Sequence, residues 1–219
     1  MAHRIKLEVW ADVLFPWCWV VKRRLAAALD ACSGRERFEV EWRSFEILPN
    51  ISRVPDETIV EMMVHLDAAD GNAALERFGE IRAQVLAELG LELNLEEARP
   101  VNSFDAHRLV HLAATQDAED ALLELLFRAY LTDNRNIANR AVLRELAAEA
   151  GLEAASVEAL LTGPTHSDDV RADERRAAEL EIAGVPTIVL DGRDKAAGPS
   201  TTGELAELLE GALGAARRP

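Results

Sequence analysis

Apolar residues near the N-terminus follow a two-residue period, which is typical of half-buried strands. Ile5 to Trp10 alternates Ile, Leu and Val with Lys and Glu, and Phe38 to Trp42 alternates in the same way. Between these two segments lies a helix-forming run from Trp17 to about Ala31. A helix that connects two such strands predicts a parallel, right-handed strand–helix–strand unit.

The C-terminal part of the chain returns to strand and then to helix. Thr187 to Leu190 is short and rich in β-branched residues, as strands are. Asp191-Gly192 follows as a hairpin turn signal and leads to a weak edge strand near residues 195–197. A final helix is expected to begin at Thr201 or Thr202 and to run to about Leu213.

The middle of the chain is dominated by good helix formers, with few β-branched runs. We expect helices near residues 56–68, 72–89, 104–116, 118–131, 139–150, 153–161 and 166–180. Since strands stand at both ends and helices between them, the economical arrangement is one sheet built from both ends, with the helices inserted. This predicts a first part at 1–54, a helical insertion at 55–176 and a second part at 177–219.

Composition limits the classes of partner. Hydrophobic residues make up 49% of the 219 residues, and the formal net charge is −15. This charge argues against nucleic acid and against an anionic membrane surface, because both attract basic proteins. The N-terminus lacks an apolar leader, and no run approaches the roughly 18 apolar residues of a membrane span. We therefore expect a cytoplasmic protein.

Candidate chemistry begins with the segment Phe15-Pro16-Trp17-Cys18, which opens the first helix. Pro is favoured at the first helical position, and a Cys in the first turn can be a stabilised thiolate. The alternative is that Cys18 is a small buried hydrophobe. The other cysteine, Cys32, is 14 residues further on, about 20 Å away along a helix and too far to form a disulfide.

Two further residue types around this segment each have a functional and a structural interpretation. Asp12 is a candidate general base or a group that tunes Cys18, and otherwise an Asx-turn residue. Trp17, together with Phe15, could line an apolar pocket for a planar ligand, or these residues could be core. Trp10 and Trp42 lie on predicted strands, where core positions are expected.

Three stretches of the sequence resemble the DsbA family of thioredoxin-fold proteins. They are Val9 to Leu25, which holds the Phe15-Pro16-Trp17-Cys18 motif, the helix start Asn102 to Leu109, and Ala183 to Val189. The chain is most similar to the FrnE-like branch, which is related to 2-hydroxychromene-2-carboxylate isomerases and kappa-class glutathione transferases. The resemblance implies an α/β, thioredoxin-like fold with an inserted all-helical domain.

The resemblance also implies where the site lies. The first cysteine of the family's CPWC motif falls at Phe15, where the isomerase and kappa relatives carry Ser. Val185 and Pro186 correspond to the loop that holds the family's cis-proline, opposite the motif. The helix start would border the cleft, so that Asn102, Phe104 or His107 would contact the substrate. His107 and His111 are four residues apart, but there is no third ligand at a recognisable spacing, so no metal is expected.

These observations leave several functions open. The first hypothesis is a redox-inactive relative that binds a small aromatic or polyketide-like substrate as a small-molecule partner, with isomerisation as the reaction it would catalyse. Alternatives are a glutathione-linked isomerase or transferase, with glutathione as its cofactor, and a monothiol oxidoreductase that acts through Cys18, with Asp12 beside it. A non-catalytic interaction protein is the fourth. Relatives in this branch are often dimers, which makes a homodimer a further expectation.

Overall fold

The computed structural model describes residues 4–192 and 194–215. Its elements, in chain order, are β1 (Ile5–Ala11), α1 (Pro16–Ala31), the 3-10 turn η1 (Arg35–Arg37), β2 (Phe38–Ser44), α2 (Ile59–His65), α3 (Gly71–Leu89), α4 (Phe104–Ala114), α5 (Glu119–Leu131), α6 (Arg140–Glu149), α7 (Ala154–Thr162), α8 (Ser167–Glu179), β3 (Thr187–Leu190), β4 (Asp194–Ala197) and α9 (Thr202–Ala215). The strands and helices expected from the sequence are present, with ends that shift by a few residues.

The chain divides into two compact units. One unit joins the residues up to Phe45 with those from Arg171 onward, and the other spans Glu46 to Val170. The first boundary therefore lies earlier than position 54, where the sequence analysis places it. The reason is that the stretch after β2 bonds within the helical unit, where the Asn102 N–H donates to Ser52 O at 3.0 Å. The second boundary falls inside α8, so this helix contributes to both units.

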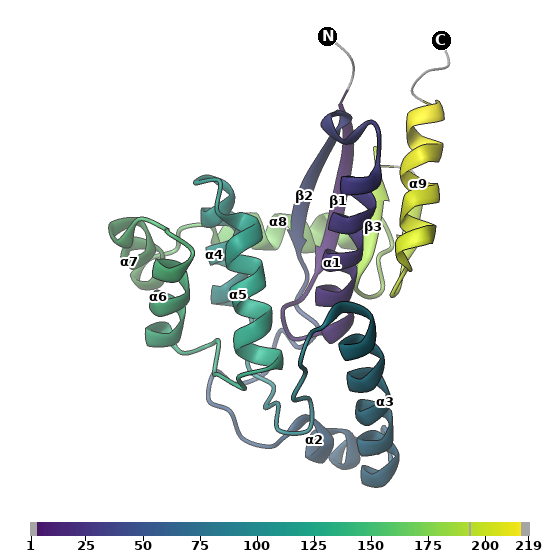
Figure 1. The fold of residues 1–219 in the computed structure, drawn as a ribbon. Coiled ribbons are helices and arrows are strands. Elements are labelled where there is room, and N and C mark those ends of the chain that lie inside the picture. Colours follow the sequence, from purple (N-terminus) through teal and green to yellow (C-terminus); the bar gives the residue numbers. More distant parts are fainter. Residues whose placement is uncertain (1–3, 193, 216–219) are drawn as a thin grey trace. The chain divides into compact units, whose positions relative to one another are not determined.

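The sheet of the first unit has the strand order β2-β1-β3-β4. β1 and β2 are parallel, with Ile5 opposite Phe38, which confirms the predicted strand–helix–strand unit. β1 and β3 are antiparallel, with Trp10 opposite Thr187. β3 and β4 form the antiparallel hairpin that the Asp191-Gly192 turn signal predicts. Both ends of the chain thus build one sheet (Figure 1).

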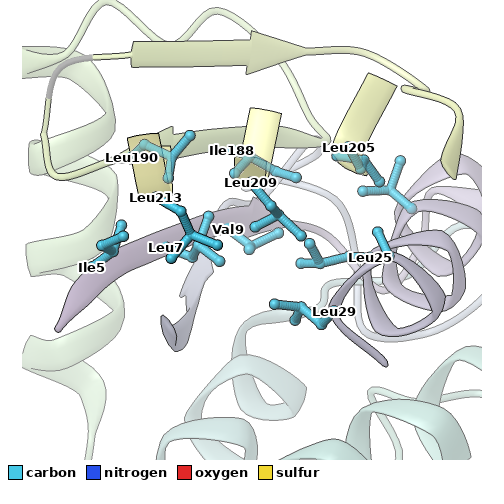
Figure 2. Close-up of a cluster of buried hydrophobic side chains, with 12 residues drawn as sticks. Ile5, Leu7, Val9, Leu25, Leu29, Ile188, Leu190, Leu205, Leu209 and Leu213 are labelled. Carbon is cyan, nitrogen blue, oxygen red and sulfur yellow. The ribbon is translucent and has the colours of Figure 1, made fainter. Parts of the chain in front are cut away.

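One face of this sheet is covered by α1 and α9, which contact each other (Figure 1). Odd-numbered β1 residues point into this layer together with side chains from β3 and both helices, as Figure 2 shows. The fully buried members of this cluster are Ile5, Leu7, Val9, Val21, Leu25, Ala28, Leu29, Ile188, Leu190, Leu205, Leu209 and Leu213. The fit is close at Gly34, where a Cβ would come within 2.8 Å of Leu213 Cδ1.

The opposite face carries a smaller apolar cluster, formed by Trp10, Ala177, Ile182 and Val189. Trp10 is fully buried, and its Nε1–H donates to the backbone oxygen of Asp173 at 3.2 Å. A buried tryptophan usually needs such a partner. The prediction that Trp10 is a core residue is therefore confirmed, and the second half of α8 is the element that covers this face.

The helical unit has its own core and its own capped helices. Its largest fully buried side chains come from α4 to α7 and the loop before α6, and they include Leu109, Leu122, Leu126, Phe127, Leu131, Ile137, Leu143, Leu160 and Leu161. Thr58 and Glu61 form a capping box at the start of α2, which satisfies two exposed backbone donors. No helix in residues 4–192 and 194–215 is both long and apolar enough to cross a membrane.

Candidate functional site

A tight turn follows β1 and leads into α1. The Phe15 N–H donates to Asp12 O at 3.1 Å, and the Leu14 N–H donates to the Asp12 carboxylate oxygen Oδ1 at 3.2 Å. This is the Asx turn given above as the structural interpretation of Asp12. Asp12 is fully buried, so its carboxylate lies beneath the turn.

Phe15 is the N-cap residue of α1 and has an extended backbone, but its side chain makes no capping hydrogen bond. Pro16 is the first helical residue, as predicted. The Cys18 N–H donates to Phe15 O at 3.0 Å and closes the first turn. Phe15, Pro16 and Trp17 are half-buried. The turn therefore presents aromatic and apolar groups at the place where the family's pattern has its first cysteine.

Cys18 points away from this surface, with 0% of the residue exposed. Burial raises the pKa of its thiol well above the ordinary value, a hydrogen bond from the Asp12 backbone opposes this shift, and the Asp12 charge adds to it. A thiol must ionise to act as a nucleophile. The first turn of a helix can stabilise a thiolate, but here the desolvation of Cys18 has the larger effect and keeps the thiol neutral. This favours the interpretation of Cys18 as a buried hydrophobe.

The loop before β3 lies at the same end of the sheet as this turn. Trp10 pairs with Thr187 across β1 and β3, so the residues after β1 and those before β3 leave the sheet together. The Val185–Pro186 peptide bond is cis, as the resemblance implies. Val185 is half-buried and packs against the Trp10 cluster, while Pro186 O accepts a hydrogen bond from the Gly198 N–H at 2.9 Å.

The other three predicted contact residues belong to the helical unit. The Asn102 Nδ2–H₂ group donates to Glu46 Oε1 at 3.1 Å and to Pro49 O at 3.2 Å, and Asn102 Oδ1 accepts from the Phe104 N–H at 3.2 Å. Asn102 therefore has a structural role at the start of α4. Phe104 is half-buried and His107 is 3% exposed. Contact of any of these residues with a substrate stays a prediction.

The same helix start is held in place by a buried arginine. Arg108 is 5% exposed, and its guanidinium donates to Asp105 Oδ1 at 2.8 Å, to Leu160 O at 2.7 Å and to Thr165 O at 2.8 Å. It also donates to Gly163 O. Arg108 thus satisfies carbonyl groups at and beyond the end of α7, which would otherwise lack partners.

A group of charged residues lies on the Trp10 face of the sheet and is not among the residues predicted from the sequence. Glu8 is 1% exposed and accepts two hydrogen bonds from Arg176, at 2.8 and 2.6 Å, and two from Arg43, at 3.1 and 3.0 Å. Arg43 also donates to Asp173 Oδ1 at 3.0 Å, and Asp173 Oδ2 accepts from the Ser44 N–H at 2.9 Å. The alternation of apolar and polar residues in β1 predicts that Glu8 faces solvent. Nothing in the sequence near Glu8 indicates that α8 covers it.

Burial alone acts to raise the pKa of Glu8, but the hydrogen bond from Arg176 and the charges of Arg43, Arg176 and Lys6 outweigh it. The pKa of Glu8 is therefore lower than its ordinary value. Glu8 stays ionised at neutral pH and holds two arginines over the sheet. This network fixes the second half of α8 and the end of β2.

A family model for the DSBA-like thioredoxin domain matches residues 6–210. The chain belongs to this family of DSBA-like thioredoxin domains. Among solved structures, a probable DsbA oxidoreductase from Streptomyces coelicolor is 35% identical, with a TM-score of 0.92 over 99% of this chain and 92% of that one. An uncharacterised Bacillus subtilis protein, YwbO, is 28% identical over 85% of this chain and 86% of its own length.

More distant structures show the same fold. The cytosolic disulfide reductase DsbM from Pseudomonas aeruginosa is 22% identical, covers 96% of this chain and 99% of its own, and has a TM-score of 0.65. A 2-hydroxychromene-2-carboxylate isomerase is 14% identical over 96% of this chain and 95% of its own, also with a TM-score of 0.65. The predicted thioredoxin-like fold and the resemblance to the DsbA family are confirmed.

The burial of Cys18 predicts how the stability of this DSBA-like domain depends on alkaline pH. Unfolding returns the Cys18 pKa from its raised value to about 9.0. Below pH 9 the Cys18 thiol is neutral in both states, so it does not change the free energy of unfolding. Above pH 9 the thiol ionises only in the unfolded state, which stabilises that state and lowers the free energy of unfolding. The loss approaches about 1.4 kcal/mol per pH unit for one such group.

The measurement is urea unfolding at about pH 8 and about pH 10.5 for the wild type and for Cys18→Ala. The free energy of unfolding should fall more steeply with pH in the wild type than in the variant. Cys32 is present in both proteins and cancels in the comparison. Equal decreases in the two proteins would show that the folded environment does not hold Cys18 neutral.

Proposed function

We propose that this DSBA-like protein does not catalyse dithiol–disulfide exchange. In this proposal it binds a small aromatic or polyketide-like molecule beside the Phe15 turn, and isomerisation is the reaction class to test. The single observation that carries the proposal is Phe15 at the N-cap of α1, with Cys18 fully buried beneath it. The resemblance assigns the attacking sulfur of the family to position 15.

The cysteine content of the chain supports the first half of the proposal. Disulfide exchange needs an attacking thiolate and a second thiol that resolves the mixed disulfide. The whole chain has two cysteines, Cys18 and Cys32. Cys32 is the C-cap residue of α1 and lies at the far end of that helix from Cys18. A rise of 1.5 Å per residue over 14 residues separates them by about 20 Å, so they do not serve each other as partners.

The surface of the turn supports the second half. The half-buried Phe15, Pro16 and Trp17 offer apolar and aromatic contacts, and the half-buried Val185 lies at the same end of the sheet. Binding sites for small molecules are mainly apolar, with a few polar groups. The buried Asp12 beneath the turn is the candidate polar group, as a base or as a charge that tunes the site.

A glutathione-linked isomerase or transferase is the second candidate. DsbM has also been solved with GSH, and that structure is 22% identical to this chain. A likeness at this level reflects the fold, so the argument for glutathione comes from the branch and not from a particular residue here. A monothiol oxidoreductase is less well supported, because Cys18 is buried. The proposal also includes membership of the FrnE-like branch, a cytoplasmic location and a homodimer. The remaining alternative is a non-catalytic interaction protein.

Restoring the family's cysteine should restore thiol chemistry. Residues 15 and 18 are joined by a hydrogen bond that closes a turn, which brings their Cα atoms within about 7 Å. That separation is within reach of a disulfide. We expect Phe15→Cys to reduce insulin disulfides with dithiothreitol as the reductant, while the wild type shows only the background rate.

Phe15→Ser is the matched control, because it removes the aromatic ring without adding a thiol. It should be as inactive as the wild type. The double variant Phe15→Cys, Cys18→Ser should form mixed disulfides that are not resolved. A wild type that reduces insulin as fast as Phe15→Cys would contradict the loss of dithiol exchange.

Ligand binding at the turn can be tested with 2-naphthol, a small neutral aromatic probe, by calorimetry. If Trp17 forms part of the site, Trp17→Ala should weaken binding by about tenfold, which corresponds to the loss of one good aromatic contact. Trp42→Phe is the control, because Trp42 packs partly buried against the core cluster of the sheet. Equal affinity in Trp17→Ala and the wild type, or no binding to either, would contradict an aromatic site at this turn.

A further inference from the structure

A hollow lies at the other end of the sheet from the Phe15 turn. It is an open depression of about 480 Å³, lined by Arg4, Lys6, Glu8, Glu39, Arg176, Asp191 and Gly192. These residues come from the beginnings of β1 and β2, from α8 and from the turn after β3. From Lys6 to Asp12 the chain advances six residues, which is about 20 Å along an extended strand. The hollow is therefore distinct from the candidate site above.

The inner wall of this hollow is rich in hydrogen-bond donors. Glu8 is 1% exposed, and Arg176 and Arg43 occupy its two oxygens. Arg176 uses Nε and one terminal nitrogen for Glu8, and its other terminal nitrogen forms no hydrogen bond within residues 4–192 and 194–215. Lys6 Nζ contacts Glu41 at 2.8 Å and keeps a side-chain exposure of 40%. The ammonium of Lys6 and the guanidinium of Arg176 thus border the hollow beside the Glu8 carboxylate, which is already paired with two arginines.

The rim adds charges of both signs. Arg4 and Glu39 are exposed, and neither side chain makes an ion pair with another residue of the described ranges. Asp191 Oδ1 accepts from the Lys6 N–H at 2.8 Å, which leaves its other carboxylate oxygen for a ligand. Gly192 contributes no side chain and has a φ of +72°, a conformation that favours glycine. The lining carries three cations and three carboxylates.

We propose that this hollow binds a small zwitterion of the amino-acid type. The carboxylate of the ligand would lie against Arg4, Lys6 and Arg176, and its ammonium group would lie against Glu39 and Asp191. Lys6 and Arg176 already pair with Glu41 and Glu8, so the charges left for a ligand are Arg4 on one side and Glu39 and Asp191 on the other. A zwitterion matches both of these signs, whereas a ligand with one charge matches only one. The presence of both signs among these remaining groups is what favours a zwitterion over an anion such as phosphate.

The test is a titration of the full-length, ¹⁵N-labelled protein with L-glutamine, followed by amide chemical shifts. The largest shifts should occur at Lys6, Glu39 and Gly192. Acetate and methylammonium each carry one of the two charges, and each should bind at least about tenfold more weakly, since each loses one set of charged hydrogen bonds. Acetate or methylammonium binding as tightly as glutamine, or no saturable shift with glutamine, would overturn the proposal.

Two variants separate the two ends of the ligand. Arg4→Gln and Glu39→Gln should each weaken glutamine binding about tenfold, and both residues are exposed, so the fold should be unaffected. Glu36→Gln, an exposed acidic residue on η1, is the matched control and should bind like the wild type. Unchanged affinity in both Arg4→Gln and Glu39→Gln would place the shifts outside this hollow and overturn the proposal. The insulin and naphthol assays report on the opposite end of the sheet and are independent of this result.

Discussion

The packing of α1 on the sheet determines what the Phe15 turn can do chemically. Cys18, Val21 and Leu25 follow one another at spacings of three and four residues and share the buried face of the helix. Because this face contacts β1 and α9 in the core, the sulfur of Cys18 points inward and not toward the surface. The side chain left at the turn is that of Phe15, a large apolar group in a position where polar caps are preferred. The chemistry available at the surface is therefore aromatic.

The opposite face of the sheet depends on a buried carboxylate. Glu8 gains two arginines as partners, and each element that supplies one is thereby fixed to the sheet. Removing one member of such a network leaves a buried charge without a partner, which typically costs about 3–5 kcal/mol. The same network pairs the carboxylate at the base of the hollow near Lys6 with two arginines, so that the ligand charges proposed there are matched mainly by the rim residues Arg4, Glu39 and Asp191. One interaction thus supports both the architecture of this face and its proposed binding property.

Periodicity was sufficient to predict the elements and the way they combine. The alternation of apolar and polar residues in Ile5–Trp10 and Phe38–Trp42 predicts the two parallel strands. The β-branched segment that begins at Thr187 predicts a further strand, and with it one sheet built from both ends of the chain. The sequence does not predict whether Cys18 is buried or exposed. Residues 17–21 are all apolar, so their pattern does not distinguish the buried face of the helix from the exposed one. The partners of Glu8 were not predictable either, since Arg176 is 168 residues away in the sequence.

The structural role of the residues at the start of α4 could not be predicted from their residue types. The segment Asn102 to Leu109 carries polar and charged residues that the resemblance assigns to the cleft. The structure shows that Arg108 and Asn102 use their donors on carbonyl and carboxylate groups of their own unit. Such long-range bonds to backbone carbonyls leave no sequence signal, because every residue type presents the same carbonyl group. His107 and Phe104 stay candidates for substrate contact.

The most direct test of the central claim is the rate at which iodoacetamide alkylates Cys18 in the native protein, with Cys32→Ser as the background. The rate should be followed as a function of pH. If burial controls this thiol, modification should be absent in the native state and should appear only at the rate of unfolding, at every pH. A native reaction that follows a pKa below about 8.5, the value of a free thiol, would show an accessible and stabilised thiolate. That result would contradict the account and would make Cys18 the catalytic group.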